Sequence, residues 1–166
     1  MMLLLREHYP INRLCDVLDL PRSSAYYGPQ PGDDRLILDA LVKVADIMWR
    51  PQEKRLMITL NRFDWPAAEG EAPRLRRCRS ALRFERVNSC KCRCVNPAGK
   101  DAVLNLLAVE FAETDPPAGA VMLTFSGGGV LRLEVECLEA ELCDLGPSWP
   151  ATARPVHMDD APDPRG

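Results

Sequence analysis

The chain has 166 residues, of which 46% are hydrophobic and 27% are charged, with a formal net charge of −3. This size and composition suit one domain of ordinary size with a small appendage. No apolar run approaches the roughly 18 residues that a membrane helix needs, and the apolar start at residues 1–5 ends before the about 7–15 residues of a signal-peptide core. We therefore expect a cytoplasmic protein without membrane association, whose seven cysteines are reduced thiols.

Residues 1–38 carry the pattern of a short helical hairpin. Apolar side chains recur at helical spacing over residues 11–18, directly after Pro10, which suits the first turn of a helix. Pro21 interrupts this pattern, and Ser23 or Ser24 can cap a second short helix. The two helices predict a helix-turn-helix-like unit.

The amino-acid sequence of this segment points to a family more specifically than its helical periodicity does. Tyr9–Leu18 and Leu20–Tyr27 resemble the start of the catalytic-subunit reading frame of insertion-sequence (OrfB-type) transposases, over roughly residues 7–41. That family continues with a Tyr-Gly-Tyr-Arg-type segment and an integrase core with two Asp and one Glu that bind metal. Neither follows here, so the resemblance implies a truncated remnant without transposase activity.

Two roles are open for this remnant. It can contact DNA, in which case Arg13, Arg22 and Ser23 would supply phosphate contacts. Alternatively, it only adds a helical cap to the domain that follows.

The body of the chain, residues 39–150, has the period of β-strands. Ala45–Trp49 and Leu56–Trp65 flank a segment of turn composition and predict a hairpin, and Leu82–Cys94 predicts a third strand. Residues 96–101 are predicted to form a loop that leads into a helical turn near Val103.

Three further alternating runs follow, at residues 107–111, 121–125 and 131–137. The glycines at 127–129 suit a tight turn with positive φ between the last two of these runs. Leu138, Leu142 and Leu145 then recur at helix-like spacing, which predicts a short helix or irregular segment before Gly146.

The two halves of this body resemble each other, and each predicts a three-stranded antiparallel meander. One meander cannot bury its own apolar face, whereas two packed together can. The predicted fold class is therefore α+β and mostly β, with two meanders packed as a sandwich or open barrel after a helical hairpin. Five prolines in the last twenty residues predict a flexible tail over residues 151–166.

Asp39–Trp49, Leu60–Trp65 and Gly127–Gly146 resemble a bacterial family catalogued only as a domain of unknown function, over roughly residues 39–160. The resemblance implies no known activity. It implies that members begin with a further strand and helix, which this chain replaces with transposase-like sequence. A missing strand would expose a sheet edge.

A cysteine run raises the question of a metal site. Cys90, Cys92 and Cys94 would need a fourth ligand from the set Cys78, Cys137, Cys143 and His157. Structural zinc usually takes Cys-x₂₋₄-Cys pairs, whereas alternate residues of a strand place their thiols in a line. We predict instead small apolar side chains that face a core, with no metal and no cofactor.

Charge is unevenly distributed along the body. Residues 71–100 hold nine basic and two acidic residues, and residues 101–145 hold nine acidic residues and one arginine. The basic stretch can contact nucleic acid, or it can pair across the sheet with acids such as Glu134 and Glu136. The candidate nucleic-acid contacts of this stretch are Arg74, Arg76, Arg77, Arg79, Lys91 and Arg93, with Arg83 and Arg86 in the same cluster.

No serine, cysteine or carboxylate occurs in a recognisable catalytic context with His8 or His157, the two histidines of the chain. We therefore predict that the β-rich domain is a non-enzymatic interaction module with no catalytic residues. The sequence does not identify its partner, and a protein is one option. The alternative is a DNA-binding protein that uses the N-terminal helices, the basic stretch or both.

Overall fold

The computed structural model describes residues 35–64, 67–68 and 72–154. The predicted helical hairpin, with Arg13, Arg22 and Ser23, lies outside the described residues, as does most of the predicted tail. The described strands are β1 (Arg35–Lys43), β2 (Ile47–Arg50), β3 (Arg55–Phe63), β4 (Arg76–Phe84), β5 (Val87–Arg93), β6 (Val103–Asp115), β7 (Ala118–Phe125), β8 (Val130–Val135), β9 (Ala140–Asp144) and β10 (Trp149–Pro150).

All ten strands belong to one antiparallel sheet. Its order is β10-β4-β3-β1-β6-β7-β8-β5, with β2 paired to β3 and β9 paired to β4. Two three-stranded meanders are present, β2-β3-β4 and β6-β7-β8. They are not two separate sheets, however, because β1 pairs with β3 on one side and with β6 on the other.

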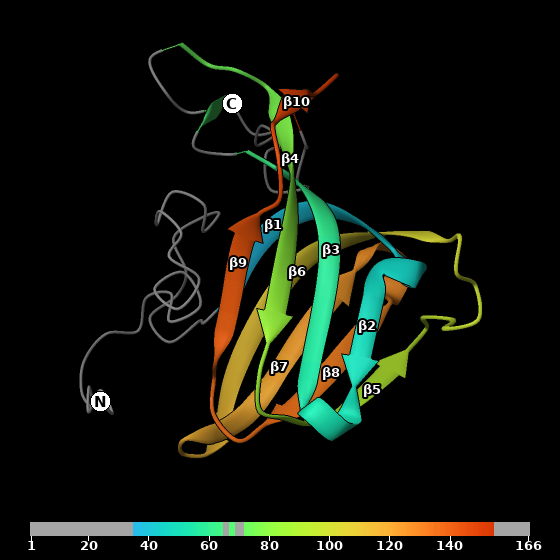
Figure 1. Cartoon of the computed structure of the whole chain (residues 1–166), viewed down its shortest axis with the longest axis vertical. Helices are drawn as coiled ribbons and strands as arrows, with labels where there is room; N and C mark the ends of the chain where they lie inside the picture. The colour runs from blue at the N-terminus through green and yellow to red at the C-terminus, as the bar shows by residue number, and fades with distance from the viewer. Residues whose placement is uncertain (1–34, 65–66, 69–71, 155–166) are drawn as a thin grey trace, which may run out of the picture.

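The sheet doubles over so that its two meanders face each other. In Figure 1, β2, β3, β4 and β9 form the near layer, and β6, β7, β8 and β5 run behind them. Buried side chains from both layers form one core cluster, among them Ile58 and Phe84 from the near layer and Phe125 and Leu133 from the far layer. Sheet closure is absent among the described residues, because no ladder joins β2 to β5.

The buried positions predicted on β7 and β8 are confirmed. Val121, Leu123 and Phe125 on β7, and Leu131 and Leu133 on β8, are all buried. On β6 the sequence placed Leu107 inward, but the structure buries the preceding residue, Leu106, together with Val109 and Phe111. A register shift between Leu106 and Ala108 in the pairing with β7 accounts for the difference.

Leu138–Leu145 forms no helix, because Ala140–Asp144 is strand β9. Leu142 lies opposite Leu82 of β4, and both contribute to the core. A four-residue apolar spacing fits either element, and the backbone hydrogen bonds offered by the edge of β4 favour the strand. Similarly, the helical turn expected near Val103 is the start of β6.

The predicted third strand, Leu82–Cys94, is in fact parts of two strands. β4 starts earlier, at Arg76, and ends at Phe84, whereas β5 starts at Val87. Between them Arg86 has a φ of 55°, which turns the chain sharply. The turn sends β5 to β8, at the far end of the strand order. The predicted glycine turn is confirmed, with φ of 75° at Gly127 and 79° at Gly128.

The core between the layers should carry most of the stability. Phe84 is fully buried, so Phe84→Ala is expected to lower the free energy of unfolding by about 3–5 kcal/mol. Val103 is 56% exposed, and Val103→Ala should change the free energy of unfolding by no more than about 0.5 kcal/mol. Urea denaturation of both variants measures the two values, and equal losses would contradict the assigned core.

Candidate ligand-binding cleft

Two strand edges face each other on one side of the molecule. β2 pairs with β3 alone, and β5 pairs with β8 alone. At one end the gap between them is closed by the Val87 amide, which donates to the Lys54 carbonyl at 2.8 Å. At the other end, the Val44 amide donates to the Ala102 carbonyl at 2.9 Å, and the Ala45 amide to the Lys100 carbonyl at 3.0 Å.

Between these ties lies a cavity of about 540 Å³, which we call the β2–β5 cleft. Its volume falls within the range of roughly 300–1,000 Å³ that is typical of ligand pockets. The lining residues are Val44, Ile47, Met48, Trp49, Arg50, Cys90, Cys92, Val95, Pro97, Lys100 and Leu131. Most of them are apolar, so the cleft offers mainly hydrophobic contact.

Strand register explains why these side chains line the cleft. Trp49 lies opposite Leu56 of β3, whose side chain is fully buried, so Trp49 projects from the same core-facing side of the sheet. Cys92 lies opposite Leu131 of β8 in the same way, and Cys90 lies opposite the buried Leu133. Alternate residues of β2 and β5 therefore extend the core to the open side of the sheet.

The thiol of Cys90 is neutral at physiological pH. Burial, with a smaller contribution from Cys92, raises the pKa of Cys90 to about 11. A protonated thiol behaves as a small, weakly polar group. The Cys90 side of the cleft therefore adds no negative charge.

Both charged residues that line the cleft are basic. The Arg50 guanidinium pairs with Glu53, with 3.0 Å between Nη1 and Oε1. Lys100 is exposed and forms no ion pair within the described part of the chain. No acidic residue lines the cleft among the described residues. The local field therefore favours an anionic group.

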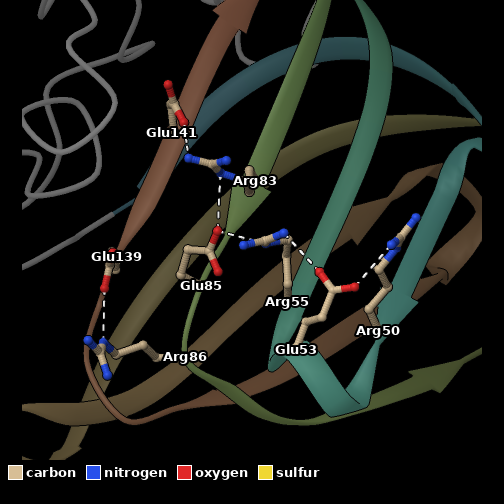
Figure 2. Close-up of polar contacts among 8 residues, drawn as sticks. All are labelled: Arg50, Glu53, Arg55, Arg83, Glu85, Arg86, Glu139 and Glu141. Carbon is tan, nitrogen blue, oxygen red and sulfur yellow. Dashed lines mark hydrogen bonds and ion pairs between the residues drawn. The ribbon is translucent and has the colours of Figure 1, made fainter.

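Next to the cleft, a row of ion pairs crosses the outer face of the sheet (Figure 2). Arg55 bridges Glu53 and Glu85, at 2.9 and 2.8 Å. Arg83 bridges Glu85 and Glu141, at 3.3 and 2.5 Å. Arg50 completes this network through Glu53, so one rim residue of the cleft is held by the row.

Residues 35–157 match the model of a protein family, DUF2948, whose description is protein of unknown function. The chain belongs to the DUF2948 family. No curated protein matches it, and no solved structure matches it. The resemblance to a domain of unknown function is thus confirmed, and the DUF2948 match includes every strand of the sheet. No helix in the described part of the chain has the length and apolar character needed to cross a membrane.

In this DUF2948 chain three of the predicted nucleic-acid contacts, all on β4, form contacts within the protein. Arg76 pairs with Asp64 at 2.6 Å, and Arg79 lies 3.9 Å from Asp46. Arg77 donates to two backbone carbonyls, at 3.1 and 3.2 Å. Arg74 is exposed ahead of β4.

Lys91 and Arg93 are exposed on β5, which lies near the opposite end of the strand order from β4. The basic stretch therefore divides between two separate strands.

Cross-strand charge pairing is present, but with partly different acids. Glu136 pairs with Lys54 and, at 3.9 Å, with Arg86, and the first contact lowers the pKa of Glu136. Glu134 pairs with Arg132 of its own strand. Arg86 also pairs with Glu139 at 3.1 Å. Strand β9, which follows Glu139, pairs with β4 in the sheet.

Several polar side chains of the inner face contact one another. Ser80 is fully buried and donates to Asp144 at 2.6 Å, and Arg62 pairs with the same carboxylate at 2.9 Å. Burial raises the pKa of the Cys78 thiol, and the nearby Asp64 carboxylate adds to the effect. A buried hydroxyl and a protonated thiol are poor nucleophiles. Among the described residues, no three His, Cys, Asp or Glu side chains are placed to hold a metal ion.

The β2–β5 cleft itself was not found by sequence reasoning. The alternation of Ile47 with Trp49 indicated core-facing positions, and both pack against the core. The prediction that Cys90, Cys92 and Cys94 face a core is right for Cys90 and wrong for Cys92 and Cys94, which are exposed. What the sequence did not show is that β5 leaves β4 and pairs with β8, which is the step that brings Cys90 near Trp49.

The ion-pair row predicts unequal effects of two matched substitutions. Glu85 has a side chain that is 20% exposed and contacts two arginines, so Glu85→Gln should cost about 1–2 kcal/mol of stability. Glu141, at 56% exposure, contacts one arginine, and Glu141→Gln should cost less than about 0.5 kcal/mol. Denaturant unfolding at low and high salt measures both, and a larger loss for Glu141→Gln would be contrary to the described network.

The raised pKa of Cys90 predicts a pH-dependent reactivity. Iodoacetamide reacts with the thiolate, so Cys90 should react slowly near pH 8 in the folded chain and faster as the pH approaches about 11. Cleavage after Lys91 separates Cys90 from Cys92 for mass spectrometry. Equal rates in folded and urea-unfolded protein at pH 8 would contradict the burial of the thiol.

The same shift predicts a change in stability. Stability from the protonated Cys90 should be complete below the ordinary pKa of 9.0 and should be lost as the pH rises toward about 11, because the unfolded chain releases the proton first. Cys90→Ala should lack this part of the pH dependence in thermal unfolding experiments.

Proposed function

We propose that this protein is a non-enzymatic interaction module that acts by binding an apolar group of its partner in the β2–β5 cleft. The observation that carries the proposal is the apolar lining of a cavity of about 540 Å³ between two strand edges. Trp49 and Leu131 are among the apolar lining residues, and the Cys90 thiol is neutral. Such a group can belong to a protein partner or to a free molecule.

The engagement of the other polar side chains supports binding over catalysis. Catalysis requires a nucleophile or base that reaches the substrate. Ser80 is buried against Asp144, and the glutamates beside the cleft are occupied by arginines. Cys90 carries a proton at physiological pH. The cleft thus offers shape, apolar surface and positive charge.

A large side chain introduced into the β2–β5 cleft should abolish ligand binding while the fold is kept. We expect the fluorescence of N-phenyl-1-naphthylamine, a neutral apolar dye, to rise on addition of the full chain. Cys92 is exposed and lines the cleft, so Cys92→Trp should lower dye affinity at least about tenfold by occupying the space. Lys91 is its exposed neighbour outside the lining, and Lys91→Trp should leave the affinity unchanged.

Thermal unfolding of both variants shows that the fold is kept. The proposal is wrong if the wild-type chain leaves the dye fluorescence unchanged, or if Cys92→Trp binds the dye as well as Lys91→Trp does.

DNA binding is the second candidate. It is favoured by Arg74, Lys91 and Arg93, which form no ion pair within the described residues. The transposase-like segment at residues 7–41, with Arg13, Arg22 and Ser23, would add phosphate contacts. Phosphate contacts give a log–log salt dependence of about −0.9 per contact.

The interaction-module proposal predicts no retardation of a nonspecific DNA duplex at moderate salt in a mobility-shift assay. Retardation that weakens steeply with salt, and that weakens further in an Arg74→Gln, Lys91→Gln double variant, would favour the DNA-binding candidate.

A further inference from the structure

The shape of the β2–β5 cleft restricts what can occupy it. The ties between Val87 and Lys54 at one end, and between Ala45 and Lys100 at the other, are backbone hydrogen bonds of 2.8 and 3.0 Å. A long extended peptide that ran between β2 and β5 would have to break one of them. A compact molecule, or one short chain that enters from the open side, fits without such a change.

The lining restricts the body of this molecule. Ile47 and Trp49 belong to residues that pack against the main core, and Leu131 is itself part of that core. The Cys90 thiol beside them is protonated because burial raises its pKa to about 11. An inserted group therefore meets hydrocarbon, an indole ring and a neutral sulfur, and the favourable occupant is an alkyl or aromatic body.

The rim restricts the charge of the molecule. Lys100 lines the cleft, is exposed, and forms no ion pair among the described residues. Arg50 lies on the same lining, and Glu53 already neutralises part of its charge. No described acidic residue belongs to the lining, so an anionic head group can pair with Lys100.

From these three restrictions we infer that the β2–β5 cleft binds a small amphipathic acid, with its alkyl body against Trp49 and Leu131 and its carboxylate at Lys100. The inference rests on the proposed binding function and names its ligand class. The occupant is a free molecule of this chemistry, which enters from the open side of the cleft.

Three ten-carbon probes with different head groups test the inference. Decanoate carries its carboxylate on a nonyl chain, decanol and decylamine carry a hydroxyl and an ammonium on a decyl chain, and calorimetric titration of the full chain gives each affinity at neutral pH. Decanoate should bind about tenfold more tightly than decanol, because a charge-assisted contact to Lys100 adds to a closely similar apolar burial. Decylamine should bind more weakly than both.

Matched charge variants locate the contact. Lys100→Gln should lower decanoate affinity about tenfold and leave decanol affinity unchanged. Lys91→Gln removes an exposed lysine that lies outside the lining, and it should change neither affinity. Cys92→Trp should weaken all probes that bind the wild-type chain.

Failure of the inference differs from failure of the binding function. Equal affinities for decanoate and decanol, or an unchanged decanoate affinity in Lys100→Gln, would overturn the acid while the binding function stands. Binding of none of the three probes, with the dye still bound, would also overturn the acid alone, whereas absence of dye binding as well would overturn both. A second copy of the chain in the cleft would also overturn the inference. Analytical ultracentrifugation would then show a dimer that persists when decanoate is added in excess, and decanoate binding would be lost at high protein concentration.

Discussion

The pairing of β1 with both meanders is the constraint on which the rest of the structure depends. β1 contacts β3 at Leu41 and pairs with β6 from Arg35 to Lys43, with a register shift after Ile37. It converts two half-sheets into one sheet that doubles over on its own apolar face. Without it, each three-stranded half would have to bury its face alone, and a small isolated sheet rarely succeeds. The core, the facing edges of β2 and β5, and the β2–β5 cleft all follow from this doubling.

The uneven charge of the sequence has a structural explanation in the same arrangement. The basic residues of β4 and of the turn after it meet acids that come much later in the chain, on β9 and in the turn before it, as in the contacts of Arg83 with Glu141 and of Arg86 with Glu139. Charges that are segregated in sequence thus alternate in space. Exposed pairs of this kind contribute little each, whereas Glu85, shared by two arginines, combines several of them into a network.

Much of the strand content could be read from the sequence, because alternation with a period of two is a local property. It identified the hairpin of β2 and β3 and the buried residues of β7 and β8. Two kinds of error arose. The bulge in β6 and the strand β9 depend on partners, since Leu142 becomes part of the sheet only beside Leu82. The break at Arg86 was also missed, because an arginine with positive φ has no distinctive local pattern. Since the β2–β5 cleft is created by that break, the candidate site was beyond reach from the sequence. Of the three cysteines predicted to face a core, Cys90 is half-buried, whereas Cys92 and Cys94 are exposed.

The mutual position of β2 and β5 has a consequence for solubility. A sheet that ends in unpaired strands normally offers a template on which other molecules add strands, and natural proteins guard against this. Here each exposed margin is shielded by the opposite one, with backbone ties at both ends. Any event that swings the two margins apart would present both templates simultaneously, together with the apolar surface between them. Such an opening would therefore be the first step toward self-association, and a molecule bound between the two margins would guard the protein against it.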